Sequence, residues 1–171
     1  MDLKALLNEE TLKPKEKTEL LSQMLLQQRL STNELIVFAS SAKDPVKATC
    51  IEALEKATQQ APSILDEAGF LFVTEALKAK APRIKWESAR VIGNTASHFL
   101  PLLELATQHL LENSEHPGTV VRWSSAFALG VILQLNTPHQ QDLKLAIEQI
   151  MQREEKNSIK KIYQEALKKL S

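Results

Sequence analysis

Cysteine is almost absent from this sequence, and so are long apolar runs. The single cysteine, Cys50, cannot form a disulfide within the chain, which is typical of proteins in reducing compartments. No apolar run approaches the length of a membrane span. The first residues offer only Ala5-Leu6-Leu7 before a polar stretch, which is too short for the apolar core of a signal peptide. We therefore expect a cytoplasmic protein that does not enter a membrane.

An excess of either charge is also missing, and glycine is scarce. Lysine plus arginine number 21, as do aspartate plus glutamate, so the overall field favours neither nucleic acid nor an anionic membrane as a partner. There are four glycines, and the seven prolines fall between periodic segments. This distribution predicts helices joined by short loops, and no segment reads as a strand. We predict an all-α protein with a single domain.

A recurring pattern is what the sequence does contain. It is clearest at residues 120–133, Val-Val-Arg-Trp-Ser-Ser-Ala-Phe-Ala-Leu-Gly-Val-Ile-Leu, and it returns at 84–93 as Ile-Lys-Trp-Glu-Ser-Ala-Arg-Val-Ile-Gly. Weaker copies begin at Val46 and Ile159, so the four copies are spaced at intervals of 38, 37 and 38 residues. A fixed period in this range is typical of a repeat array, in which each unit buries its apolar face against its neighbours.

Each repeat is expected to hold two helices, and the recurring pattern forms the second. Apolar periodicity predicts first helices at 63–79 and 139–153, followed by second helices at 82–97 and 158–170. The leucine-rich segments 2–12 and 15–30, separated at Pro14, match the repeat poorly and predict an N-terminal helical cap. The predicted division is a cap at 1–31 and repeats at 32–61, 62–98, 99–136 and 137–171.

These residues resemble the HEAT-repeat family, whose second helix typically reads Val-Arg-x-x-Ala-x-x-Ala-Leu-Gly after Asp-Pro. The matching segments are Asp44–Lys47 with Ala53-Leu54, Ile84-Lys85 with Val91–Gly93, and Val121-Arg122 with Ala128–Gly130. The resemblance implies a right-handed α-α superhelix whose second helices line a concave surface. The aspartate before the second helix survives only as Asp44, so we do not expect the family's ladder of aspartate–arginine bonds.

Helical phase predicts which side chains leave the core. At 100° per residue, positions zero, four, seven and eight of a second helix share one arc, and in the third repeat they are Val121, Ser125, Ala128 and Leu129. Positions two, six and nine lie opposite, on the side that the resemblance assigns to the concave surface. They are Trp86, Arg90 and Gly93 in the second repeat and Trp123, Phe127 and Gly130 in the third.

We predict a partner-binding set made of Trp86, Arg90, Trp123 and Phe127, because tryptophan, arginine and phenylalanine are enriched at interaction hot spots. The alternative is that both tryptophan rings pack between repeats. The two helix-breaking glycines, Gly93 and Gly130, predict close approach of another helix.

Position one of each second helix is basic: Lys47, Lys85, Arg122 and Lys160. Lys85 and Arg122 complete the predicted partner-binding set, where they would orient acidic groups of the partner. The alternative is that these side chains bond carbonyls or carboxylates of the neighbouring repeat, with their stems packed.

No residue pattern predicts chemistry. His98, His109, His116 and His139 lack metal-ligand spacing, Cys50 occupies an apolar repeat position, and Ser124 and Ser125 lie mid-helix. We predict a non-enzymatic scaffold or adaptor that binds a protein or peptide, without catalytic, cofactor or metal residues.

Two alternatives stay open. One is a nucleic-acid-binding or enzymatic module that resembles the HEAT-like alkylpurine DNA glycosylases, through Trp86, Trp123 and Arg90. That family's aspartate is missing, because the matching positions hold Glu52, Arg90, Phe127 and Glu165, and the chain lacks a basic bias. The other resembles bilin-lyase-type HEAT proteins, but it shares only the general repeat pattern. The partner's identity and the oligomeric state are not predicted.

Overall fold

The structure is a computed structural model, and it describes residues 2–170. In these residues the chain forms ten α-helices and no strand. The helices are α1 (Leu3–Leu7), α2 (Pro14–Leu26), α3 (Thr32–Ser40), α4 (Asp44–Gln60), α5 (Glu67–Ala76), α6 (Pro82–Thr95), α7 (Leu103–Asn113), α8 (Thr119–Leu133), α9 (Gln140–Arg153) and α10 (Asn157–Lys169). The predicted all-α fold is confirmed.

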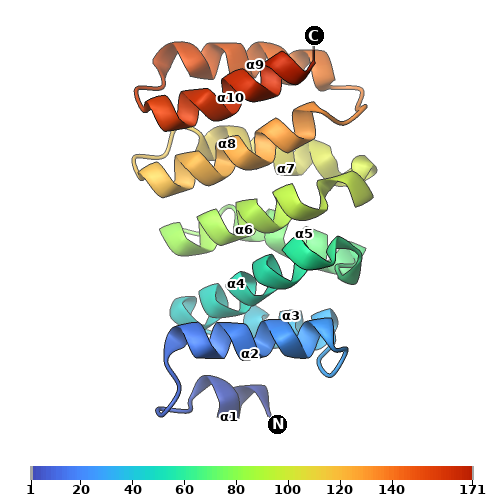
Figure 1. The fold of residues 1–171 in the computed structure, drawn as a ribbon, viewed down its shortest axis with the longest axis vertical. Coiled ribbons are helices and arrows are strands. Elements are labelled where there is room, and N and C mark those ends of the chain that lie inside the picture. The colour runs from blue at the N-terminus through green and yellow to red at the C-terminus, as the bar shows by residue number, and fades with distance from the viewer. Residues whose placement is uncertain (1, 171) are drawn as a thin grey trace.

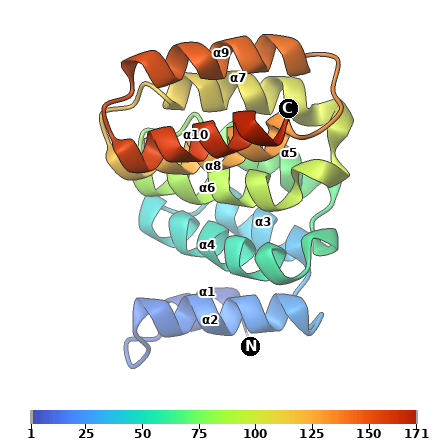
Figure 2. The same cartoon turned by 45° about the horizontal axis from the view of Figure 1, so that its top comes forward.

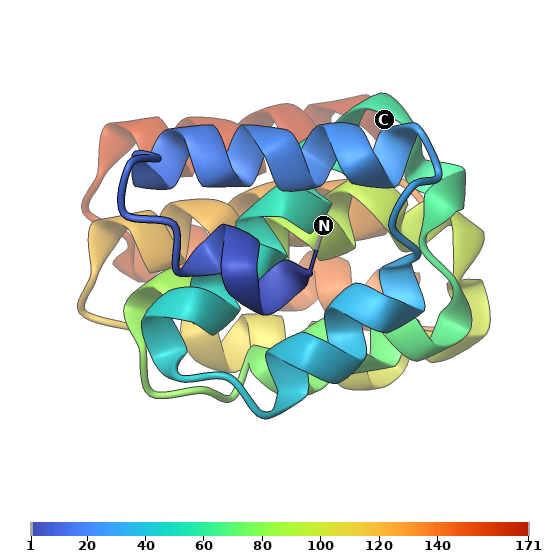
Figure 3. The same cartoon turned by 90° about the horizontal axis from the view of Figure 1, so that it is seen from below.

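Consecutive helices form pairs that stack in chain order, so the two ends of the chain lie at opposite ends of the stack (Figure 1). The second helices of the pairs, α2, α4, α6, α8 and α10, form one layer, and α3, α5, α7 and α9 form the other (Figure 2). Figure 3 looks along the stack and shows the two layers, with α1 and α2 nearest the viewer. We call the outward side of the first layer the second-helix face, and that of the other layer the first-helix face.

Prolines and capping side chains determine where several helices begin. Pro14, Pro45 and Pro82 occupy the first turn of α2, α4 and α6, where a missing N–H costs nothing because it has no intrahelical acceptor. The Ser31 hydroxyl accepts a hydrogen bond from the Glu34 N–H at 3.0 Å, and Asp66 accepts from the Gly69 N–H at 2.8 Å. These caps satisfy backbone donors that the first turn leaves free.

The core lies between the layers and follows the predicted helical phase. In α8, Val121, Ser125, Ala128 and Leu129 are all buried. Ile84, Ser88, Val91 and Ile92 occupy the same positions in α6 and are buried too. The small Ser88 and Ser125 side chains leave room for the neighbouring helices, so one stripe of each second helix builds the stack.

Three helix predictions were too long. The helix predicted at 15–30 ends at Leu26. The first helix ends at Leu7 and not near residue 12. The predicted helix 63–79 is a short 3-10 turn, Pro62–Ile64, followed by α5 from Glu67 to Ala76. Asp66 separates them because its backbone is extended and its side chain caps α5. Apolar periodicity runs through both segments and does not reveal this break.

Both helix glycines allow close contact between neighbouring repeats, as predicted. A β carbon at Gly93 would overlap the Phe127 ring, and one at Gly130 would lie 3.4 Å from the β carbon of Ala166. The phase prediction for these two positions was wrong, because both glycines are buried. Position nine therefore faces the next repeat, while positions two and six of α6 and α8 are half-buried on the second-helix face. No helix of the described residues is long and apolar enough to cross a bilayer.

Candidate functional site

Side chains of α6 and α8 meet on the second-helix face, where Arg90 of α6 contacts an aromatic ring of α8. Trp86 and Trp123 are both half-buried. The Trp123 and Phe127 rings stack with centroids 6.3 Å apart and an interplanar angle of 11°. The guanidinium carbon of Arg90 lies 5.6 Å from the centroid of the Trp123 ring, a cation–π distance. Three residues of the predicted set, from two repeats, thus form one continuous patch.

A groove of about 420 Å³ continues this patch between α8 and α10. Its α8 side includes Trp123, Phe127 and Val131, and its α10 side includes Ile162 and Ala166. No residue of α7 or α9 lines it, so it opens on the second-helix face. The groove is mostly apolar, with Glu165 and Lys169 as its charged groups. This composition suits an apolar side chain of a partner.

A charged cluster occupies the next junction of the same layer, between α4 and α6. Arg83 donates to Glu52 at 2.6 Å and to the Thr49 hydroxyl at 3.5 Å. Glu87, one turn after Arg83, is only 3% exposed, and Glu55 is 9% exposed. Three carboxylates, Glu52, Glu55 and Glu87, thus share the junction with Arg83 and Arg90. We call these three carboxylates the acidic cluster.

Burial raises the pKa of Glu87 to about 8, and the negative charges of Glu52 and Glu55 act in the same direction. A hydrogen bond with Glu52 favours the protonated form further, while Arg90 opposes the shift. Burial also raises the pKa of Glu55, again against the attraction of Arg90. Desolvation disfavours the charged form of a carboxyl group, so Glu87 holds its proton at neutral pH.

Sequence reasoning missed the acidic cluster. Glu52 was considered as a residue at the position of the glycosylase aspartate, and neither Glu55 nor Glu87 was predicted to lie in a site. A signal was present: position three of the second helix is Thr49 in the first repeat, Glu87 in the second and Ser124 in the third. All three are buried, so a glutamate where its counterparts are small hydroxyl residues marks an unusual buried carboxyl.

Lys85 and Arg122 have partners within the protein. Lys85 donates to the Leu77 carbonyl at 3.0 Å and to Asn113 at 2.9 Å. The Arg122 Nε and Nη2 donate to the two carboxylate oxygens of Glu154 at 3.1 and 3.2 Å, and Nη1 bonds two backbone carbonyls. Both residues therefore fit the packing alternative, and we remove them from the partner-binding set. Their bonds join successive repeats.

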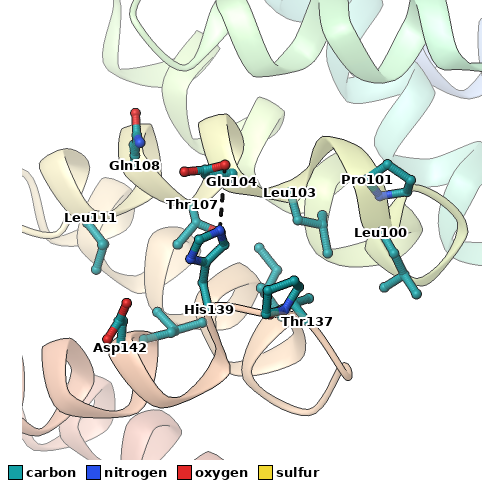
Figure 4. Close-up of a pocket in the computed structure, with 13 residues that line it drawn as sticks. Leu100, Pro101, Leu103, Glu104, Thr107, Gln108, Leu111, Thr137, His139 and Asp142 are labelled. Carbon is teal, nitrogen blue, oxygen red and sulfur yellow. Dashed lines mark ion pairs between the residues drawn. The ribbon is translucent and has the colours of Figure 1, made fainter.

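The first-helix face has pockets that the sequence did not predict. The pocket in Figure 4 lies between α7 and α9 and has a volume of about 320 Å³. Leu103, Ile132 and Leu143 give it apolar walls, and His139 lies 3.6 Å from Glu104 at its rim. A second groove lies between α5 and α7, where Leu71 and Leu105 are exposed.

Histidine and cysteine chemistry adds no site. No group of three or more potential metal-ligating side chains gathers in residues 2–170. His98 and His139 are exposed, and the His116 Nδ1 accepts a hydrogen bond from the Gly118 N–H within a turn. Cys50 is fully buried, and burial raises the pKa of its thiol to about 12. The thiol is therefore a small apolar group of the core, as predicted.

No family model matches the chain, and no curated protein matches its sequence. Its fold does match solved structures. A designed armadillo repeat protein in complex with peptide (KR)4 superposes with a TM-score of 0.76 at 17% identity, over 99% of this chain and 80% of that chain. The chain is a helical repeat solenoid. Computationally designed armadillo repeat proteins for modular peptide recognition also give 0.76, at 16% identity over 97% and 79%.

A chain of a phycocyanin lyase complex has a similar fold. One chain in the structure of the complex of CpcE and CpcF of phycocyanin lyase from Nostoc sp. PCC7120 superposes with a TM-score of 0.68 at 15% identity, over 96% of this chain and 96% of that chain. At this identity the likeness establishes the repeat architecture and not the function. The specific HEAT assignment stays a prediction, as does the partner-binding role of Trp86, Arg90, Trp123 and Phe127.

Proposed function

We propose that this solenoid is a non-enzymatic, HEAT-like cytoplasmic scaffold that binds an extended segment of another protein on its second-helix face. The observation that supports it best is the patch of Trp123, Phe127 and Arg90, which continues into the groove between α8 and α10. Half-buried aromatic rings beside an apolar groove offer a partner large contact area with little loss of side-chain entropy.

The architecture supports a peptide as the ligand. A stacked helix layer presents a long, preformed surface, and binding to it orders only the ligand. A structural neighbour of the same fold is a complex with peptide (KR)4, and another was designed for modular peptide recognition.

The alternatives have less support on this face. A glycosylase-like role has less support because no aspartate stands at the matching positions, which hold Glu52, Arg90, Phe127 and Glu165, and because the chain lacks a basic bias. The lyase neighbour shares the fold alone, and no side chain of the second-helix face can be assigned to a bilin.

Selection of linear peptides from a random phage-displayed library tests the proposal. We expect selected peptides to bind the wild type and to lose at least about tenfold in affinity for the Trp86→Ala/Trp123→Ala double variant. The matched control is Leu71→Ala/Leu105→Ala, which truncates exposed side chains of the first-helix face. Thermal unfolding checks that both variants remain folded. The proposal is wrong if the selected peptides depend on Leu71 and Leu105 and not on the tryptophans.

A further inference from the structure

The acidic cluster contains a buried carboxyl group, Glu55, that no cation of residues 2–170 bonds directly, although the charges of Arg90 and Lys56 attract it. Glu55 is 9% exposed, and its carboxylate makes no hydrogen bond and no ion pair. Arg83 is bonded to Glu52, and Arg90 lies over the Trp123 ring. Burying a carboxylate without a bonded counter-charge is costly. A partner that supplied a positive charge here would remove that cost.

The cluster is still reachable from solvent. The Glu52 side chain is 27% exposed. The fully enclosed, unpaired side-chain atoms of the described residues include no Glu55 oxygen, so the tip of that carboxylate keeps contact with water. The bonds of this junction come only from α4 and α6, which places the junction in the layer that carries the aromatic patch.

The negative charge of the acidic cluster and its distance from the apolar groove indicate what kind of ligand could bind both. Resting on the proposed function, we propose that the acidic cluster binds an arginine or lysine side chain of the partner segment, while an apolar side chain about 6 residues away fills the groove between α8 and α10. The spacing follows because these two junctions are two helix separations apart, roughly 20 Å. An extended chain covers that distance at about 3.3 Å per residue.

The proton on Glu87 makes binding of a cation at the acidic cluster depend on pH. The groups around it are Glu52, Glu55 and Lys56 on α4 and Arg83 and Arg90 on α6. A bound cation favours the ionised form of Glu87, whose pKa is raised to about 8 by burial and by its acidic neighbours. Binding therefore releases a proton, and the affinity rises as the pH passes through that value.

Synthetic Gly/Ser peptides that carry one arginine and one leucine about 6 residues apart test this inference. Calorimetric titration of the full chain at about pH 7 and pH 9 gives the affinity and the proton release. We expect at least a tenfold loss, about one unit in log Kd, when the peptide arginine becomes glutamine or when Glu55→Gln is introduced. Glu75→Gln, an exposed carboxylate on α5, is the matched control and leaves binding unchanged. In Glu87→Gln, the rise in affinity with pH disappears.

The outcomes separate the inference from the proposed function. Equal binding of the arginine and glutamine peptides, with both lost in Trp123→Ala, overturns the cation site and leaves peptide binding on this face intact. Absence of binding by every peptide of this pattern also overturns the inference, and the phage selection then decides the proposed function independently. Binding that survives Trp123→Ala overturns the groove and the second-helix face together.

Discussion

Two buried glutamates of this solenoid, Glu154 and Glu87, have similar exposures, 5% and 3%, and opposite pKa shifts. Burial alone would raise the pKa of Glu154, but hydrogen bonds from Arg122 and from the backbone of Lys156 outweigh it, and the pKa is lowered. Glu87 has no guanidinium bonded to it, and its pKa is raised. The partner, and not the depth of burial, decides whether a repeat junction is a structural bond or a titratable site.

The Arg122–Glu154 pair should contribute more to the free energy of unfolding than any other charged contact of the described residues. We predict that Arg122→Ala lowers the free energy of unfolding by about 4 kcal/mol at neutral pH, because it leaves Glu154 buried and unpaired. Urea unfolding followed by circular dichroism measures the loss. The double variant Arg122→Ala/Glu154→Gln should recover at least half of it, since the orphaned charge is gone. A loss below about 1 kcal/mol for the single variant would place this pair with ordinary surface salt bridges.

Glu87, at the junction of α4 and α6, should make the free energy of unfolding fall as the pH rises. Glu87 releases its proton near its ordinary pKa of 4.5 when unfolded and at about 8 when folded. Between these values the folded state binds more protons, so unfolding becomes easier with pH, by at most about 1.4 kcal/mol per pH unit. We predict that the stability of Glu87→Gln relative to wild type rises by about 1 kcal/mol per unit between about pH 5 and pH 8. Parallel stability curves for the two proteins would contradict the raised pKa.

The two glycine contacts between second helices differ in how closely the helices approach each other. At the α6–α8 junction, a methyl group at Gly93 would overlap the Phe127 ring. Gly93→Ala should therefore cost about 1 to 2 kcal/mol, even after the gain in helix propensity. Thermal denaturation measures the change, and Phe127→Leu in the same chain should relieve part of it. A more stable Gly93→Ala would mean that the ring moves aside freely.

Gly130→Ala should have the smallest effect. Its new β carbon would meet Ala166 at 3.4 Å, close to ordinary contact, so the crowding and the gain in helix propensity nearly cancel. We expect a change within about 0.5 kcal/mol. If this variant were as damaging as Gly93→Ala, the α8–α10 junction would be as tight as the α6–α8 junction.

The sequence was sufficient to predict the repeat, its period and its buried stripe. Position four, Ser88 and Ser125, is buried because a period of 3.6 residues places it over the core. The same period could not show that Asp66 interrupts an apolar segment, since the interruption depends on local capping.

The polar contacts between repeats were harder to predict. Arg122 meets Glu154, 32 residues away, and Glu87 meets Glu52, and neither pairing follows from the phase of one helix. Such pairings depend on how neighbouring helices stack. The position of Trp86, Trp123 and Phe127 on the second-helix face could be predicted from the sequence, because the three side chains lie opposite the apolar stripe of their helices.

The most direct test of partner binding on the second-helix face follows the two indole N–H signals in a nitrogen–proton NMR spectrum. Trp86 and Trp123 give one signal each, and single substitutions assign them. Titration with the arginine–leucine peptide should shift the Trp123 signal, because this ring borders both Arg90 and the groove. If the peptide binds and both indole signals stay in place while backbone signals of α5, α7 or α9 move, the partner binds the first-helix face and the account is wrong.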